Sequence, residues 1–281
     1  MRRGEYTLYR PISYRISLRA EKKLMSEKVQ YYSSFSEDVI SSAEQTATVP
    51  ADYEWIRPGI KARIFSALTY SAAVTLGWIW CKTVLHISYK NRRAVNTAKD
   101  GCFIYCNHTQ PFGDVVLPAF LSLKKRVYTI VSPANLGIPV IGKILPALGA
   151  LPIPQSLGQM KSFLSAVGKR ASGKNCVVIY PEAHVWPYYA GIRPFEDTSF
   201  RFPCELDKPA FAMTVTYQKR RFGSRPKATI YLDGPFYPDK SLSPKQRRAE
   251  LCNRVKSAME ERSKLSTYEY IKYVKRGDET A

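Results

Sequence analysis

The chain reads CFIYCNHTQPFGD from residue 102 to residue 114, and this stretch decides the fold that the sequence predicts. Its first five residues form a continuous apolar run, which is typical of a short strand buried on both faces of a parallel sheet. A polar loop that contains His108 and Asp114 follows at once. A second run of the same kind, CVVIY at 176–180, is followed by Glu182. Both runs therefore place ionisable residues directly after a buried strand.

The rest of this region alternates between strand and helix patterns. Apolar runs predict further strands at 127–131, 210–217 and 228–232. Apolar residues at helical spacing predict helices over 114–125 and 157–171, and the residues SPKQ at 243–246 combine an N-cap, an N1 proline and a capping-box glutamine that start a last helix. This alternation predicts an α/β fold with a mostly parallel sheet flanked by helices.

Residues 64–81 stand apart because none of them is charged. As a helix they would be about 27 Å long, close to the roughly 30 Å of a bilayer's hydrocarbon core. Cations flank the segment, and aromatic residues suited to a membrane interface lie in or near it: Trp55, Tyr70, Trp78 and Trp80. We interpret the segment as a helix that lies in one leaflet of a membrane. A buried core helix and a true membrane span are the alternatives.

The first hundred residues are predicted to form a unit of their own. Residues 1–100 are interpreted as a basic N-terminal arm with the membrane-associating helical segment, and residues 33–51 as a linker or loosely packed arm within it. The change of pattern at Gly101 predicts that residues 101–281 form the α/β domain. The expected architecture is thus a mostly parallel sheet flanked by helices and preceded by an N-terminal hydrophobic, interfacial helical segment.

Composition restricts the class of protein and its partners. Hydrophobic residues make up 45% and charged residues 23% of the 281 residues, which excludes a disordered or collagen-like chain. The mean hydropathy of −0.27 excludes a polytopic membrane protein. The net charge of +20 predicts attraction to polyanions, such as anionic lipid or nucleic acid. The sequence contains neither a zinc-finger nor an RNA-binding signature, so we expect no nucleic-acid partner.

Cysteine and histidine spacing predicts no metal site. The chain has six cysteines without a C-x-x-C pair, and His86, His108 and His184 lack ligand spacing. Along one strand, Cys102 and Cys106 would lie about 13 Å apart, too far for a disulfide bridge. We interpret the cysteines as reduced, buried thiols in a reducing compartment.

The polar residues after the strands could carry chemistry. Because sites in open α/β sheets gather at the carboxyl ends of strands, we expect His108 and Glu182 at one edge of the sheet. A histidine next to an aspartate, here Asp114, is the minimum for general-base catalysis. The chain has no G-x-S-x-G motif, so the substrate is expected to supply the nucleophile, such as a hydroxyl. From these residues alone, a loop histidine that caps the next helix is the alternative.

Three blocks follow one another along the chain: residues 107–114 (NHTQPFGD), 137–143 (GIPVIGK) and 180–185 (YPEAHV). In this order they resemble the N-H-x4-D, G-x-x-F-I-x-R and F-P-E-G-T-R blocks of the glycerolipid acyltransferases, the 1-acylglycerol-3-phosphate acyltransferase family. Residues 193–201 are similar to the segment that trails the third block, and Pro209 with the run after it to a weak fourth block.

The resemblance implies a glycerolipid O-acyltransferase of phospholipid biosynthesis. The enzyme would move a fatty acyl group from acyl-CoA or acyl carrier protein to the hydroxyl of a lysophospholipid, with 1-acyl-sn-glycerol-3-phosphate as the favoured acceptor. His108 would take the proton from that hydroxyl, and Asp114 would orient His108. Donors in the pocket would stabilise the tetrahedral oxyanion. The resemblance implies no covalent enzyme intermediate, no cofactor and no metal.

The resemblance also implies residues that bind the acceptor. In the family the second and third blocks contact the acceptor and its phosphate, which gives that role to Gly137, Ile141, Lys143 and Glu182. The third block here lacks the family's arginine. Arg193, eight residues beyond that position, is expected to replace it together with Lys143 as a cation for the phosphate.

The chain departs from the family pattern in two places. Five residues rather than four separate His108 from Asp114, and we expect Gly113 to absorb the extra residue as a bulge, since glycine reaches backbone angles that other residues avoid. In the third block, Ala183 stands where the family has glycine and His184 where it has threonine. With these changes, the resemblance does not determine which lipid is the acyl acceptor.

The expected location follows from the segment at 64–81 and from the lipid substrates. The protein is expected to be membrane-associated at the cytoplasmic face, with anionic lipid, a lysophospholipid and an acyl thioester as partners. Two alternatives to a lysophosphatidate acyltransferase stay open at this point. One is acyl transfer to a different lipid acceptor, and the other is a catalytically silent, membrane-bound lipid-binding homologue.

Overall fold

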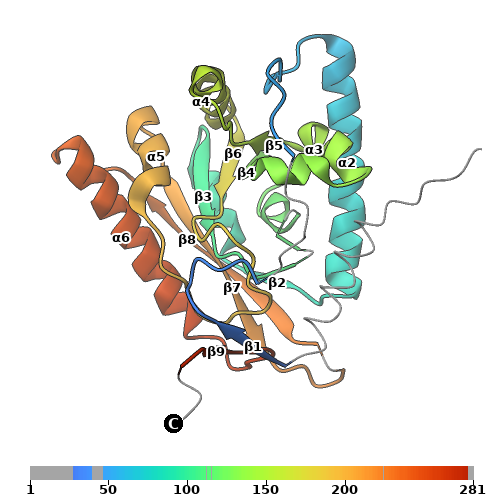
Figure 1. Ribbon diagram of the computed structural model, residues 1–281, viewed down its shortest axis with the longest axis vertical. Coiled ribbons are helices and arrows are strands. Elements are labelled where there is room, and N and C mark those ends of the chain that lie inside the picture. Colours follow the sequence, from blue (N-terminus) through green and yellow to red (C-terminus); the bar gives the residue numbers. More distant parts are fainter. Residues whose placement is uncertain (1–27, 40–46, 112, 115, 224, 278–281) are drawn as a thin grey trace, which may run out of the picture.

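A seven-stranded sheet forms the centre of the molecule, seen in a computed structural model that describes residues 28–39, 47–111, 113, 114, 116–223 and 225–277 (Figure 1). The strand order is β2-β8-β7-β3-β6-β4-β5. Neighbouring strands are parallel except for the antiparallel pair β7 and β8, which confirms the mostly parallel sheet. The strands are β2 (Ser88–Lys90), β3 (Cys102–Cys106), β4 (Arg126–Val131), β5 (Ala150–Pro152), β6 (Asn175–Ile179), β7 (Ala210–Gln218) and β8 (Lys227–Phe236).

Helices cover both faces of this sheet, as predicted. The α-helices are α2 (Ile60–Thr83), α3 (Ile141–Leu148), α4 (Leu157–Ala171), α5 (Arg201–Leu206) and α6 (Pro244–Ser263). Short 3-10 helices are η1 (Arg92–Thr97), η2 (Leu117–Phe120), η3 (Pro133–Gly137) and η4 (Asp197–Phe200). Figure 1 shows α2 on one side of the sheet and α5 and α6 on the other.

Alternation along each strand builds a core on each face. On β3, Ile104 packs into a cluster with Cys81 of α2 and Phe120 of η2. Its neighbour Tyr105 points to the opposite cluster, which includes Val255 of α6. Successive side chains of a strand point to opposite faces, so a strand with helices on both sides must be apolar throughout. This is why CFIYC carries no polar residue.

The helix predictions are confirmed in part. The capping box of α6 is present, with Gln246 Oε1 accepting the N–H of Ser243 at 3.3 Å. In α4, Phe163 is buried, whereas Leu157, the first residue of this helix, is 91% exposed. The helix predicted over 114–125 is wrong: among the residues described there, η2 alone is helical, because Pro118 lacks the N–H that an α-helix would need.

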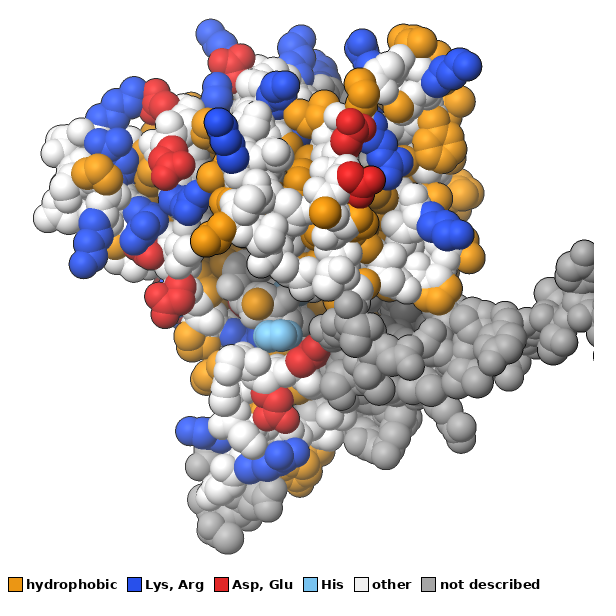
Figure 2. All heavy atoms as spheres, turned by 45° about the horizontal axis from the view of Figure 1, so that its top comes forward, with side chains coloured by type: hydrophobic (Ala, Val, Ile, Leu, Met, Phe, Trp, Pro, Cys, Tyr) orange, Lys and Arg blue, Asp and Glu red, His pale blue; other side chains and the backbone are white. Residues whose placement is uncertain are grey.

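Helix α2 packs a mixed polar and apolar face, with Val74 and Trp80 partly buried, against the domain. Ser66 and Tyr70 face the protein, where Ser66 Oγ donates to the carbonyl of Ala147 at 2.7 Å and the Tyr70 hydroxyl accepts the N–H of Val127 at 3.1 Å. Other large apolar side chains are exposed: Ile60, Ile64, Phe65, Leu68, Leu76, Trp78 and Ile79. Hydrophobic side chains line the right-hand margin of Figure 2, where α2 lies. An exposed apolar patch of this size marks an interaction surface.

The structure confirms a helix over residues 64–81 and corrects two details. Of the residues in α2, only Cys81 is buried, so the alternative of a buried core helix is wrong. Trp55 does not lie at a membrane interface, because it is buried and its Nε1 donates to the carbonyl of Pro152 at 2.8 Å. Among the described residues, α2 is the one helix whose length and composition would allow it to cross a membrane.

A second, two-stranded sheet joins residues from near the two ends of the described chain. Strand β1 (Val29–Tyr32) pairs in parallel with β9 (Lys272–Lys275). Residues 33–39, predicted to be a loose linker, instead contact the domain: Trp186 Nε1 donates to the carbonyl of Glu37 at 2.9 Å. The rest of the predicted linker lies partly outside the described residues. The domain boundary at Gly101 stays a prediction, although β2 in front of it pairs with β8 behind it.

Candidate functional site

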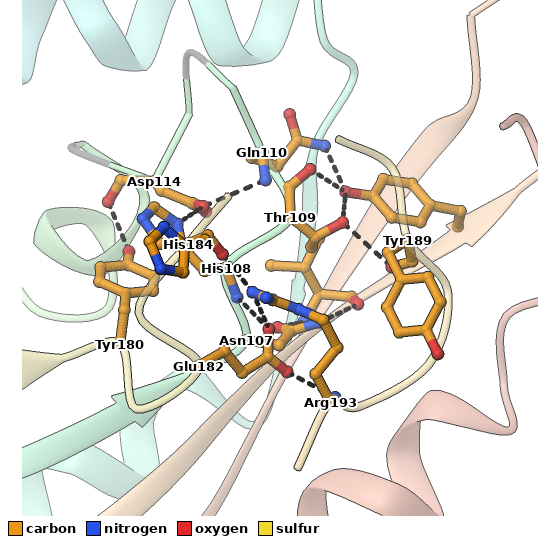
Figure 3. A network of polar contacts seen from close by, with 12 residues as sticks. Asn107, His108, Thr109, Gln110, Asp114, Tyr180, Glu182, His184, Tyr189 and Arg193 are labelled. Carbon is orange, nitrogen blue, oxygen red and sulfur yellow. Dashed lines mark hydrogen bonds and ion pairs between the residues drawn. The ribbon is translucent and has the colours of Figure 1, made fainter. Parts of the chain in front are cut away.

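His108 and Asp114 meet at the carboxyl end of β3 (Figure 3). His108 Nδ1 lies 2.7 Å from Asp114 Oδ2, and the same oxygen accepts the N–H of Gln110 at 3.1 Å. Burial raises the pKa of Asp114, while the hydrogen bond and the charge of His108 lower it. An ionised carboxylate can only accept, so Nδ1 carries the proton and Nε2 of the neutral ring is left as an acceptor.

The extra residue between His108 and Asp114 does not disturb this pair. The prediction that Gly113 forms a bulge with unusual backbone angles is wrong, because Gly113 has no positive φ. Instead the Asp114 N–H donates to the carbonyl of Gln110 at 3.4 Å, within the loop between His108 and Asp114. A Cβ on Gly113 would lie 3.1 Å from the Leu117 side chain. Glycine is therefore favoured here by close packing rather than by its backbone freedom.

Two further side chains hold this loop, and the sequence analysis did not single them out. Asn107 pairs with the backbone of Val215 in β7, donating to its carbonyl at 3.1 Å and accepting its N–H at 2.9 Å. The Tyr180 hydroxyl donates to the carbonyl of Asp114 at 2.6 Å, and its ring lies 4.4 Å from that of His108. Asn107 belongs to the first block and Tyr180 is the first residue of the third block. Their position in these blocks is the sequence feature that could have identified them as site residues.

Glu182 holds the backbone of His108 from below. Glu182 Oε2 accepts the His108 N–H at 3.1 Å and the Nη2 of Arg193 at 3.1 Å. Its other oxygen, Oε1, accepts the Arg193 N–H at 3.0 Å. Burial raises the pKa of Glu182, and Arg193 opposes this rise. Figure 3 shows the pair beneath the loop that carries His108.

Arg193 is fully buried, and the protein itself occupies its guanidinium. Besides Glu182, Nη2 donates to the carbonyl of His184 and Nη1 to that of Phe35 at 3.2 Å. The guanidinium also lies 4.9 Å from the ring of Trp186, which stacks on Tyr273 of β9. Arg193 thus connects the third-block loop to the β1/β9 sheet.

The second block follows β4, whose carboxyl end lies at the same edge of the sheet as that of β3. Gly137 ends η3, and Ile141 and Lys143 lie in the first turn of α3, where both are exposed. This segment follows β4, which is separated from β3 by β6 alone. Two strand spacings amount to about 10 Å in the plane of the sheet. Lys143 is therefore the cation of the predicted set that remains open to a ligand.

The described geometry allows general-base chemistry. The His108 side chain is 20% exposed, while that of Asp114 is 5% exposed, so a ligand can approach the ring but not the carboxylate. A neutral imidazole fixed by a buried carboxylate can accept a proton at Nε2 and later return it.

Ala183, which stands where the resembled family has glycine, has a strained backbone conformation. Its φ is +64°, in the left-handed region that glycine occupies without strain, and its side chain is exposed. We expect Ala183→Gly to raise the free energy of unfolding by about 0.5–1 kcal/mol, since no buried contact is lost. Chemical denaturation measures this change. Ala72→Gly, at an exposed position within α2, is the matched control and should lower stability by a similar amount. Equal losses in both variants would contradict the prediction.

In a comparison with known proteins, one family model matches part of the chain. Residues 86–216 match the family model described as Acyltransferase, a range that includes His108, Asp114, Lys143, Glu182 and Arg193. No curated protein matches the chain. A similar solved structure is that of the 1-acyl-sn-glycerophosphate acyltransferase PlsC from Thermotoga maritima, with 14% sequence identity and a TM-score of 0.47. That match covers 74% of this chain and 81% of the other.

Proposed function

We propose that this chain moves a fatty acyl group from an acyl thioester to the hydroxyl of a lysophospholipid, because residues 86–216 match the Acyltransferase family model. The acyl donor is acyl-CoA or acyl carrier protein, and 1-acyl-sn-glycerol-3-phosphate is the first acceptor to test. The observation that carries this proposal is the 2.7 Å contact between His108 and Asp114 at a sheet edge.

In the proposed reaction, His108 Nε2 takes the proton from the acceptor hydroxyl. The oxygen attacks the carbonyl carbon of the thioester and forms a C–O bond, giving a tetrahedral oxyanion. The C–S bond then breaks, and the leaving thiolate receives the proton from His108. Asp114 holds the ring in the productive tautomer and stabilises the imidazolium between these two steps.

We propose a positioning role for Glu182 and Arg193 in place of the expected contact with the acceptor phosphate. Both side chains are buried, and each is occupied by the other and by backbone groups. The hydrogen bond from the His108 N–H to Glu182 fixes the start of the loop that carries the base. A displacement of the base by about 1 Å can cost about 10²-fold in rate, so this support matters for catalysis.

Lys143 remains as the proposed cation for the acceptor phosphate, next to Gly137 and Ile141. We expect Lys143→Ala to raise KM for a phosphate-bearing acceptor about tenfold and to leave KM for the acyl thioester unchanged, because a charge-assisted contact contributes about 1.5–3 kcal/mol. Steady-state kinetics with each substrate varied in turn measures this. Lys174→Ala removes an exposed lysine before β6, at the other edge of the sheet, and serves as the control. Equal effects on both KM values would reject the assignment.

We propose that α2 attaches the enzyme to the cytoplasmic face of a membrane by lying in one leaflet. Its exposed side is apolar, while Ser66, Tyr70 and Cys81 contact the domain. These contacts extend over about 22 Å of the helix axis. A helix so packed cannot be surrounded by lipid, which favours the interfacial arrangement over a span. The lysolipid and its diacyl product both reside in the bilayer that α2 would contact.

The apolar face of α2 can be tested without disturbing the fold. We expect Leu68→Ser with Leu76→Ser to reduce partitioning onto neutral phosphatidylcholine vesicles about tenfold or more, because burial of apolar surface contributes about 25 cal/mol per Å². Vesicle flotation in high salt measures the bound fraction. Leu123→Ser with Leu265→Ser changes two other exposed leucines and is the control. If both pairs of substitutions have the same effect, α2 is not the attachment.

The activity itself is tested by thiol release from acyl-CoA and from acyl carrier protein with a panel of lysophospholipid acceptors. The proposal expects thiol release that depends on the acceptor and a diacyl product. Thiol release with a different lipid acceptor alone would move the chain to another acyltransferase specificity. Absence of transfer with every acceptor, together with lipid binding, would favour the catalytically silent homologue.

A further inference from the structure

The turn between β7 and β8 is strongly basic and carries no acidic residue. Residues 218–227 read QKRRFGSRPK, and five of the ten are Lys or Arg. Among the described residues, no carboxylate forms an ion pair with any of these cations. Lys219, Arg221, Arg225 and Lys227 are exposed. The segment lies beyond residues 86–216, so the acyltransferase match does not explain it.

Phe222 stands among these cations and is 78% exposed. The guanidinium of Arg221 lies 5.4 Å from the centre of its ring. An exposed aromatic side chain surrounded by Lys and Arg is the composition of segments that bind anionic membrane surfaces, where the ring enters the interface and the cations meet the headgroups.

Arg220 ties this turn to the end of α2. Its Nη2 donates to the carbonyls of Val84 at 3.1 Å and Leu85 at 2.9 Å, and its Nε donates to that of Pro226 at 3.1 Å. Carbonyls at a helix C-terminus lack partners within the helix, and a cation there is favourable. The turn is therefore fixed beside the C-terminal end of α2, which is the lower end of this helix in Figure 1.

The turn also lies at the edge of the sheet that carries the site. Strand β7 is parallel to β3, so its carboxyl end lies at the same edge as His108. Tyr188 connects the two regions: its N–H donates to the carbonyl of Thr109 at 2.8 Å. Burial raises the pKa of Tyr188, and the charges of Arg225 and Arg220 lower it.

We propose that residues 219–227, which we call the basic turn, bind the headgroups of anionic phospholipids and so hold the edge of the sheet that carries His108 against the bilayer. This inference rests on the membrane attachment proposed above. It adds a second, electrostatic contact to the apolar contact of α2. With contacts at the side of α2 and at its C-terminal end, the protein has one orientation on the membrane rather than free rotation about the helix.

The test uses the full chain and vesicles of phosphatidylcholine, with or without phosphatidylglycerol. We expect the wild type to bind the anionic vesicles at least tenfold more tightly at low salt, because each cation near an anionic surface adds to binding. High salt should remove this increment, since screening weakens charge interactions. Lys219→Gln with Arg221→Gln and Arg225→Gln should lose most of the increment and leave binding to neutral vesicles unchanged. Arg220 is kept because it fixes the turn.

Matched controls separate this inference from total charge and from the apolar contact. Lys99→Gln with Lys169→Gln and Lys174→Gln removes the same charge from exposed positions away from the turn, and should keep the increment. Binding to neutral vesicles measures the apolar contribution of α2, whereas the additional binding with phosphatidylglycerol measures the electrostatic contribution of the basic turn. Either proposal can therefore fail while the other holds. Equal increments in the two triple variants would overturn the inference. The inference would also be overturned if the triple variant of the turn kept its tighter binding to anionic vesicles but had a raised KM for acyl-CoA. That result would assign the turn to binding of the nucleotide of the acyl donor.

Discussion

His108→Ala is expected to lower kcat by about 10²–10⁴-fold, because the acceptor hydroxyl then loses its general base. Binding of both substrates should change little, since the ring contributes to the transition state rather than to the ground state. The measurement is thiol release under saturating acceptor and thioester. The residual rate reports what positioning and oxyanion stabilisation supply without the base.

Folding of this variant must be verified separately. The His108 side chain is partly exposed and its backbone N–H to Glu182 is kept on substitution, so the circular dichroism spectrum and unfolding midpoint should stay near the wild type. The control is His184→Ala, the histidine that the structure places near Asp38 at 3.6 Å rather than near Asp114. It should reduce kcat far less. Near-normal turnover in a folded His108→Ala protein would refute the proposed mechanism.

Arg193→Ala is expected to destabilise the protein by about 3–5 kcal/mol, because it leaves Glu182 buried without its partner cation. Removing the cation also raises the pKa of Glu182 further, since Arg193 is the largest opposing influence on that carboxyl. A raised carboxyl pKa gives stability at low pH that is lost as the pH rises. The deficit of the variant should therefore grow as the pH rises above 4.5, the ordinary glutamate value.

A double variant separates this buried pair from a contact with substrate. Glu182→Gln with Arg193→Met removes both charges and keeps an oxygen that can accept the His108 N–H. It should recover a large part of the lost stability, as buried pairs replaced together usually do. Urea denaturation of the two single variants and the double variant gives the coupling energy. Full stability of Arg193→Ala, with KM raised for the acceptor alone, would return Arg193 to the role of phosphate cation.

The sequence predicted the central strands because their composition admits few alternatives. The runs at 102–106 and 176–180 are apolar without interruption, and the structure places them as neighbouring strands β3 and β6 with helices on both faces. Strands β2 and β5 have only three residues each, too few for a pattern. The strand β1 was missed for another reason. Its partner β9 lies more than two hundred residues away, and pairing at that distance leaves no local signal.

The candidate site shows the same division between local pattern and tertiary contact. His108 and Asp114 lie in one loop, and the structure brings them to 2.7 Å. The burial of Arg193 could not be predicted, because it depends on Phe35, which is 158 residues away, and on Trp186, which stacks on Tyr273 of the distant strand β9. A cation near a motif suggests a ligand contact when its surroundings are unknown. Here a buried glutamate in the same motif supplies the counter-charge instead.

The β1/β9 sheet has a consequence for the order of folding. Val29 pairs with Lys272, and the N-terminal segment that follows β1 accepts a hydrogen bond from Arg193 through Phe35. Closing so long a loop is entropically costly and must wait until the last strand exists. During synthesis the central sheet can form before β1 pairs with β9 and before Phe35 contacts Arg193. We therefore expect the loop that supports His108 to become rigid last, only after residues 272–275 have left the ribosome.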